Sequence, residues 1–177
     1  FPDLEIHAST QLHNHTKEGL ELLKDLQVKR AVLARELTID EINNLDVDIE
    51  KEVFIHGALC ICYSGQCLFS SILLNRSGNR GSCAGFCRLP YDLYKNNELI
   101  KTTGKYLLSP KELNTSSSLN KILESNIASL KIEGRMKSPT YVGFVTRFYR
   151  RIIDNYYKYK KIIIDNEDIK KLMILYN

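Results

Sequence analysis

The chain has 177 residues, a length that accommodates a single domain with a substantial hydrophobic core. Its 25 Lys and Arg residues exceed its 21 Asp and Glu residues, and this mildly basic balance permits contact with nucleic acid without requiring it. Charged residues interrupt every apolar run before it reaches the length of a membrane helix. We therefore expect no membrane span, and a soluble protein of the cytoplasm.

The first half of the chain alternates short apolar runs with amphipathic segments. Strands are expected at residues 4–8, 29–34 and 52–57. A helix is expected over residues 17–26, where leucines recur at helical spacing, and a second helix follows Thr38, which forms a capping box with Glu41. Because the chain starts at Phe1, within what reads as a strand, we expect it to be a fragment of a longer protein.

The second half begins with a cysteine-rich and glycine-rich segment at residues 57–91, which predicts mainly loop with one short helix at 67–73. The elements expected after it are a hairpin or irregular insertion formed by 91–97 and 105–109, a helix at 119–125 and a strand at 129–134. A long helix is expected from Ser138, its N-cap, with Pro139 in the first helical position. Its predicted buried stripe consists of Val142, Val145, Tyr149, Ile152, Ile153 and Tyr156.

Four strand-then-helix units in succession predict parallel strands joined by right-handed crossovers, and therefore an α/β fold. A complete eight-stranded barrel needs about 250 residues, so a chain of this length would form about half of one. An open doubly wound sheet satisfies the same pattern.

Four of the five cysteines are spaced Cys-x6-Cys-x15-Cys-x3-Cys within the cysteine-rich segment. They are Cys60, Cys67, Cys83 and Cys87, and Cys62 is the spare. Four thiolates from one loop-rich segment can hold a [4Fe–4S] cluster or a tetrahedral Zn²⁺. The absence of the tight Cys-x-x-Cys pairs of a zinc ribbon favours the cluster, while disulfides and buried free thiols remain alternatives.

Four segments, 34–42, 50–67, 75–91 and 129–142, together resemble the collagenase-like peptidase family U32. The resemblance covers most of the chain. By length, residues 1–177 form one domain, and the resemblance implies that this domain is the C-terminal part of a (β/α) TIM-like barrel with a cysteine-rich insertion. It also implies a [4Fe–4S] cluster on the four spaced cysteines, and members that hydroxylate tRNA, rRNA or a quinone precursor without molecular oxygen. The segment CAGFC departs from the CAQPC-like segment of many members.

Barrel enzymes carry their functional residues at the C-terminal ends of the strands. At these ends we expect the candidate catalytic residues Glu36, His56, Glu133 and Arg135, with Arg35 beside them. The alternative is that these charged groups form salt bridges that fix loops. Three arginines near the cysteines, Arg76, Arg80 and Arg88, are candidates for binding an RNA backbone or an anionic small molecule, because guanidinium groups bind phosphate and carboxylate well.

Three functions remain open from the sequence. The first is an iron–sulfur-dependent hydroxylase of RNA, acting with the remainder of the barrel or a partner subunit. The second is a collagenase-like peptidase, for which a cysteine nucleophile paired with His56 is the one candidate arrangement. The third is a noncatalytic binding module stabilised by a metal.

Overall fold

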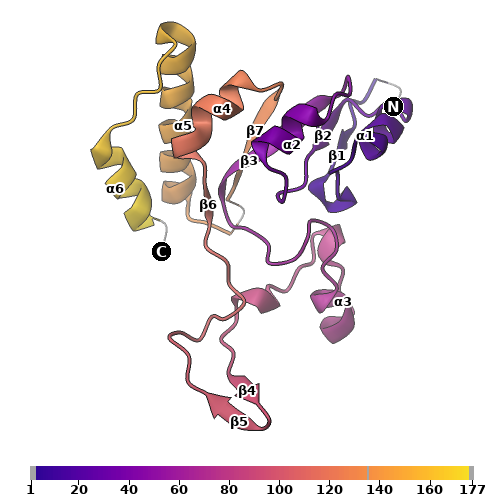
Figure 1. Cartoon of the computed structure of the whole chain (residues 1–177), viewed down its shortest axis with the longest axis vertical. Helices are drawn as coiled ribbons and strands as arrows, with labels where there is room; N and C mark the ends of the chain where they lie inside the picture. The colour runs from indigo at the N-terminus through magenta and orange to yellow at the C-terminus, as the bar shows by residue number, and fades with distance from the viewer. Residues whose placement is uncertain (1–2, 135, 176–177) are drawn as a thin grey trace.

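The computed structural model describes residues 3–134 and 136–175 and has a mixed α/β architecture built on a mainly parallel sheet (Figure 1). Strands β1 (His7–Ala8), β2 (Arg30–Val32), β3 (Glu50–Gly57) and β7 (Ser129–Glu133) are parallel where they pair. Strand β3 pairs with both β2 and β7, and the short strand β6 (Leu113–Asn114) runs antiparallel to its end. The predicted α/β class is confirmed. Strand β6 was not predicted, and the strand expected at 4–8 is shorter than expected.

The helices begin where the sequence places their caps. Helix α1 (Lys17–Asp25) is capped by Thr16, and the predicted capping box of Thr38 and Glu41 starts α2 (Ile39–Asn44). Helix α4 (Leu119–Glu124) precedes β7, and α5 (Pro139–Tyr159) follows it. In α5 the Ser138 hydroxyl accepts from the Tyr141 N–H at 3.2 Å, as expected of an N-cap. A last helix, α6 (Asn166–Leu175), was not predicted.

One hydrophobic cluster joins the helices to the sheet. Leu20 of α1, Ile42 of α2, Leu119 of α4 and Val145 of α5 all pack into the same cluster as Ile55 of β3. The helices named here therefore share one face of the sheet. None of the helices in the part of the chain that the structure describes is both long enough and apolar enough to cross a bilayer.

The stripe that α5 buries differs from the prediction at both ends, and Tyr156 at its C-terminal end is only half-buried. Val142 is 39 % exposed, whereas Tyr141 and Phe148 are buried. The first turn of α5 directs Tyr141 towards the end of β3, where its ring centroid lies 6.0 Å from that of His56. Val142, one position on, is rotated by about 100° around the helix and faces outward.

The opposite face of the sheet carries charge. Side chains alternate along a strand, so Glu50 and Glu52 lie on the other face from Val53. Arg30 of β2 donates to Glu50 at 2.7 Å, and Lys131 of β7 lies 3.0 Å from Glu52. Cross-strand ion pairs thus hold β2, β3 and β7 together on the side that lacks the hydrophobic cluster.

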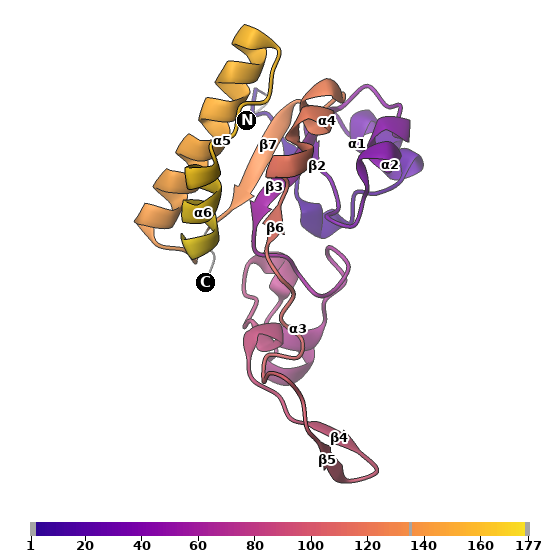
Figure 2. The same cartoon turned by 60° about the vertical axis from the view of Figure 1, so that its left-hand side comes forward.

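Residues 58–112 leave the sheet after β3 and return to it through β6. Figures 1 and 2 show this segment extending away from the sheet, with α3 (Phe69–Leu74) near the sheet and the β4–β5 hairpin farthest from it. The hairpin pairs β4 (Leu93–Lys95) with β5 (Glu98–Ile100), and Asn96 and Asn97 both have positive φ in its turn. A hairpin was predicted here, but the strand after the turn lies earlier in the chain than residues 105–109.

Candidate functional site

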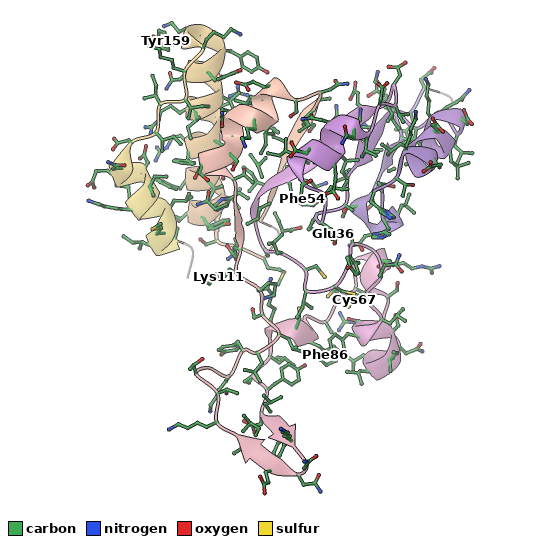
Figure 3. The ribbon with its side chains drawn as sticks, in the orientation of Figure 1. Glu36, Phe54, Cys67, Phe86, Lys111 and Tyr159 are labelled. Carbon is green, nitrogen blue, oxygen red and sulfur yellow. The ribbon has the colours of Figure 1, made fainter. Side chains whose placement is uncertain are left out.

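A pocket of about 380 Å³ lies between the cysteine-rich segment and the end of the sheet. Cys60, Cys67, Cys83 and Cys87 all line it, together with Arg35, Glu133 and the aromatic rings of Phe69 and Phe86. Cys62 is absent from its lining. Figure 3 shows Cys67 between Phe86 and the sheet-end residues Glu36 and Phe54. The structure therefore brings the four predicted ligands to one cavity.

The four thiols influence one another electrostatically. Burial raises the pKa of the Cys87 thiol, the Arg88 guanidinium lowers it, and the negative charges of Cys60, Cys83 and Cys67 raise it again. Burial also raises the pKa of Cys62, with further increases from Cys67 and Cys60, so the spare thiol lies close to two of the pocket cysteines. All five cysteines are free.

The donor set suits a group that is held by thiolates. Four sulfur donors around one cavity match the ligand requirement of a [4Fe–4S] cluster and also of Zn²⁺. Within residues 3–134 and 136–175, no three His, Cys, Asp or Glu side chains are gathered closely enough to hold a single metal ion. The four cysteines thus line one cavity, but their thiols are spaced more widely than the ligands of a single metal ion.

Arg88 links the beginning of residues 58–112 to their end. Its Nη1 donates to the Ser109 hydroxyl at 2.6 Å and to the Pro110 carbonyl at 2.9 Å, and its Nη2 donates to the Leu59 carbonyl beside Cys60. Predicted as a substrate-binding residue, Arg88 lines the pocket with its guanidinium engaged by three protein oxygens. Arg76 and Arg80, the other two candidates, are exposed and do not line the pocket.

Glu36 joins the end of β2 to the cysteine-rich segment. Its Oε1 accepts from the Ser64 N–H at 2.7 Å and from the Ser64 hydroxyl at 3.1 Å. The Ser64 hydroxyl also accepts from the Arg35 N–H at 3.2 Å. The carboxylate is therefore engaged in positioning Ser64, which lines the pocket, whereas Glu36 itself does not.

Glu133 is the predicted catalytic residue that the structure places in the pocket. It ends β7, and its Oε2 lies 3.6 Å from Nη2 of Arg35, which follows β2. The Arg35 guanidinium also lies over the Phe54 ring, 4.1 Å from its centroid. The sequence places Arg35 at a strand end but does not mark it as a catalytic candidate. Arg135, which is such a candidate, lies outside the described residues.

His56 faces the helices rather than the pocket. Phe54 pairs with Lys131 and His56 with Ile132, so Ile55 is the extra residue of a β-bulge that turns the His56 side chain to the other face of the sheet. There it is fully buried, with Nδ1 3.1 Å from the Tyr149 hydroxyl. Burial lowers the pKa of His56 to about 4, with an opposing contribution from Glu112 and a further lowering from Lys137.

Lys137 is a pocket residue that the sequence analysis missed. It lines the cavity from the turn before α5 and forms an ion pair with Glu112, which lies just before β6. The two residues are far apart in the sequence, and no local pattern pairs them. Lys137 also lies 4.9 Å from the centroid of the Tyr141 ring, a cation–π contact at the start of α5.

Comparison with known proteins establishes the class. The model of Peptidase family U32 matches residues 1–177, so the chain belongs to this family and the predicted resemblance is confirmed. No solved structure matches the chain.

The relatives carry two kinds of name. The 23S rRNA 5-hydroxycytidine C2501 synthase of Escherichia coli is 42 % identical over 156 residues, covering 87 % of this chain and 24 % of the relative. The tRNA hydroxylation protein P1 of Bacillus subtilis is 43 % identical over 163 residues, covering 88 % of this chain and 39 % of the relative. A collagenase of Porphyromonas gingivalis is 34 % identical over 168 residues, covering 86 % of this chain and 40 % of the relative. The chain thus spans less than half the length of these relatives.

Proposed function

We propose that the chain is the cluster-binding part of an iron–sulfur-dependent enzyme that hydroxylates a pyrimidine of tRNA or rRNA without molecular oxygen. The observation that carries the proposal is the pocket, in which the four spaced cysteines meet the Arg35–Glu133 pair from the strand ends. The names of two relatives more than 40 % identical to the chain support RNA as the substrate.

The parts of the pocket take distinct roles in this proposal. Cys60, Cys67, Cys83 and Cys87 hold the cluster, with Zn²⁺ as the alternative occupant. Such a cluster, when bound, supplies one-electron redox chemistry beside the substrate. Outside the pocket, the exposed side chains of Arg76 and Arg80 on the cysteine-rich segment are free to contact phosphate groups of the RNA.

We also propose that the sheet is the C-terminal part of a (β/α) barrel and that 58–112 is its cysteine-rich insertion. Parallel strands with their helices packed on one face suit a barrel wall, and the charged face would then point inward. The strands that close such a barrel would come from the rest of the protein or from a partner subunit. We place the enzyme in the cytoplasm, where its RNA substrates are found.

The peptidase reading rests on the relative named collagenase. A cysteine peptidase needs an activated thiolate within reach of a general base. Burial instead raises the pKa of Cys87, and His56 is buried on the far side of the sheet end with its pKa lowered to about 4. A raised thiol pKa opposes catalysis and ligation alike, because both need a thiolate. The position of His56, away from the pocket, is what disfavours a Cys–His catalytic pair.

Ligand replacement in the full-length protein tests the proposal. Each of Cys60→Ser, Cys67→Ser, Cys83→Ser and Cys87→Ser should lose iron, acid-labile sulfide and the broad visible absorbance of the reconstituted protein. The matched control is Cys62→Ser, which should keep all three because Cys62 does not line the pocket.

Expression of the same variants in a host without its own hydroxylase, followed by mass spectrometry of tRNA and rRNA nucleosides, tests the activity. Wild type and Cys62→Ser should produce hydroxylated pyrimidines, and the four ligand variants should not. Wild-type protein that binds zinc alone, or that leaves the pyrimidines unmodified in every RNA, would show that the proposal is wrong.

A further inference from the structure

One charged side chain in the pocket lacks the hydrogen-bond partners that its burial calls for. The Arg35 side chain is 12 % exposed, and its Nε is buried without a hydrogen-bond partner. The Glu133 carboxylate oxygen, 3.6 Å from Nη2, is too far away for a good hydrogen bond. Within the described parts of the chain, the buried Nε–H of this guanidinium therefore lacks an acceptor, which costs folding free energy unless a ligand supplies one.

The side chains around Arg35 restrict the directions from which a ligand can approach its guanidinium group. The guanidinium carbon lies 4.1 Å from the centroid of the Phe54 ring, so the phenyl face covers one side of the group. Glu133, at the end of β7, lies beside the Arg35 guanidinium, because Gly57 lets the end of β7 come close to β3. Arg35 and Glu133 thus present a donor and an acceptor side by side at the wall of the pocket that holds the cysteines.

The charges around the pocket decide which kind of ligand suits this pair. Glu133 balances Arg35 and Glu112 balances Lys137, while Arg88 keeps its positive charge because its three acceptors are neutral protein oxygens. Thiolates at the four cysteines would add further negative charge. A phosphate or other compact anion is therefore disfavoured, and a neutral planar group with both acceptors and donors on one edge is favoured.

A pyrimidine base has such an edge. Cytosine offers O2 and N3 as acceptors beside its N4 amino donor, and uracil offers two carbonyl acceptors beside its N3–H donor. We propose that Arg35 and Glu133 read the edge of the target pyrimidine: Arg35 donates to a carbonyl oxygen or to N3 of cytosine, and Glu133 accepts from the amino or imino N–H. This assignment rests on the proposed function and deepens it, because it names the residues that recognise the base.

A base that reaches this pocket has left its stack. Enzymes that act on a base bring it out of the helix or take it from a single strand, and aromatic side chains then stack on its face. Tyr63 lines the pocket while its side chain remains 66 % exposed, which suits a ring that receives an incoming base. The proposed site thus combines a stacking ring, an edge-reading pair and the cysteines.

The test uses full-length, cluster-loaded protein and compares Arg35→Lys and Glu133→Gln with the matched control Arg30→Lys. Arg30 is likewise an arginine paired with a glutamate, but it lies within β2 and outside the pocket. Ligand-observed NMR measures binding of cytidine, uridine and adenosine, and orthophosphate serves as the competing anion. The visible spectrum and a thermal melt establish that each variant keeps its cluster and fold.

Wild type and Arg30→Lys should bind cytidine and uridine, and orthophosphate should not compete. Arg35→Lys should weaken binding of both pyrimidine nucleosides by about tenfold to a hundredfold, because lysine cannot make the paired in-plane bonds. Glu133→Gln should weaken cytidine binding and let orthophosphate compete, since Arg35 then lacks its balancing charge. Unchanged cytidine binding by Arg35→Lys, or competition by orthophosphate in wild type, would overturn the assignment.

Nucleoside mass spectrometry separates this inference from the function on which it rests. If wild type restores hydroxylated pyrimidines and Arg35→Lys restores them equally well, the base-reading role is wrong and the hydroxylase proposal stands. If wild type restores none, the hydroxylase proposal is wrong, and the nucleoside-binding comparison alone then decides whether Arg35 and Glu133 bind a base.

Discussion

The contact between β3 and β7 beside the pocket depends on Gly57. Its φ is +107°, and a Cβ at this position would lie 2.1 Å from the Glu133 carbonyl oxygen. Gly57 and Glu133 are also paired in the sheet, so neither strand can move aside without opening the ladder. Gly57→Ala should therefore cost about 1–3 kcal/mol for the backbone conformation. Overpacking should add about 1–3 kcal/mol more, a large share of the roughly 5–15 kcal/mol by which proteins are stable.

Two other glycines separate these contributions. Gly85 has a φ of +71° with no atom within 4 Å of the added Cβ, so Gly85→Ala should show conformational strain alone, about 1–2 kcal/mol. Gly143 lies in α5 with equally open space, so Gly143→Ala should stabilise the helix by about 1 kcal/mol. Denaturant unfolding of the full-length variants measures all three. If Gly57→Ala loses no more stability than Gly85→Ala, the close approach of β3 and β7 is refuted.

Two further predictions concern His56 and the exposed arginines. The folded pKa of His56 is about 4 against an ordinary 6.5, so the folded state binds fewer protons between these values. The contribution of neutral His56 to the free energy of unfolding, about 3 kcal/mol at most, should be complete above pH 6.5 and should decrease as the pH falls towards 4. NMR titration of the His56 ring checks the pKa, and a pKa near 6.5 would contradict it. In the full-length protein, Arg76→Ala and Arg80→Ala should each reduce the slope of log affinity for RNA against log salt concentration by about one. Arg150 forms an ion pair with Asp154, so Arg150→Ala should leave this slope unchanged. Equal slopes in all three variants would count against a role for Arg76 and Arg80.

The helices of this fold are predictable where a cap marks their first turn. Thr38 and Glu41 exchange hydrogen bonds within one turn, and Ser138 with Pro139 starts α5, so both signals are contained in a few consecutive residues. Helix α6 has a comparable signal, because the Asp165 carboxylate accepts from the Glu167 N–H at 2.9 Å. In the sequence, residues 162–175 show only apolar runs interrupted by charged residues. Its single buried residue, Leu172, leaves little apolar periodicity to detect.

The strand ends show where a local pattern is insufficient. His56 and Glu133 are both charged or titratable residues at the end of a predicted strand, and the sequence treats them alike. The register between β3 and β7 separates them, because the bulge at Ile55 turns His56 towards Tyr149 while Glu133 reaches the pocket. A bulge depends on how two distant segments pair, and no spacing within β3 alone reveals it.

The segment that carries the spaced cysteines, residues 58–112, lies outside the hydrophobic cluster. Among the described residues, the hydrophobic cluster contains Ile55 and Leu119 but nothing from 58–112. This segment therefore gains little order from apolar burial, and the long loop it forms must be closed by polar bonds or by a bound group. Arg88 closes it at its ends through Leu59 and Ser109, and Glu36 secures it near Ser64. Four cysteines spread along such a segment have no core to occupy, and this supports the proposal that they are ligands.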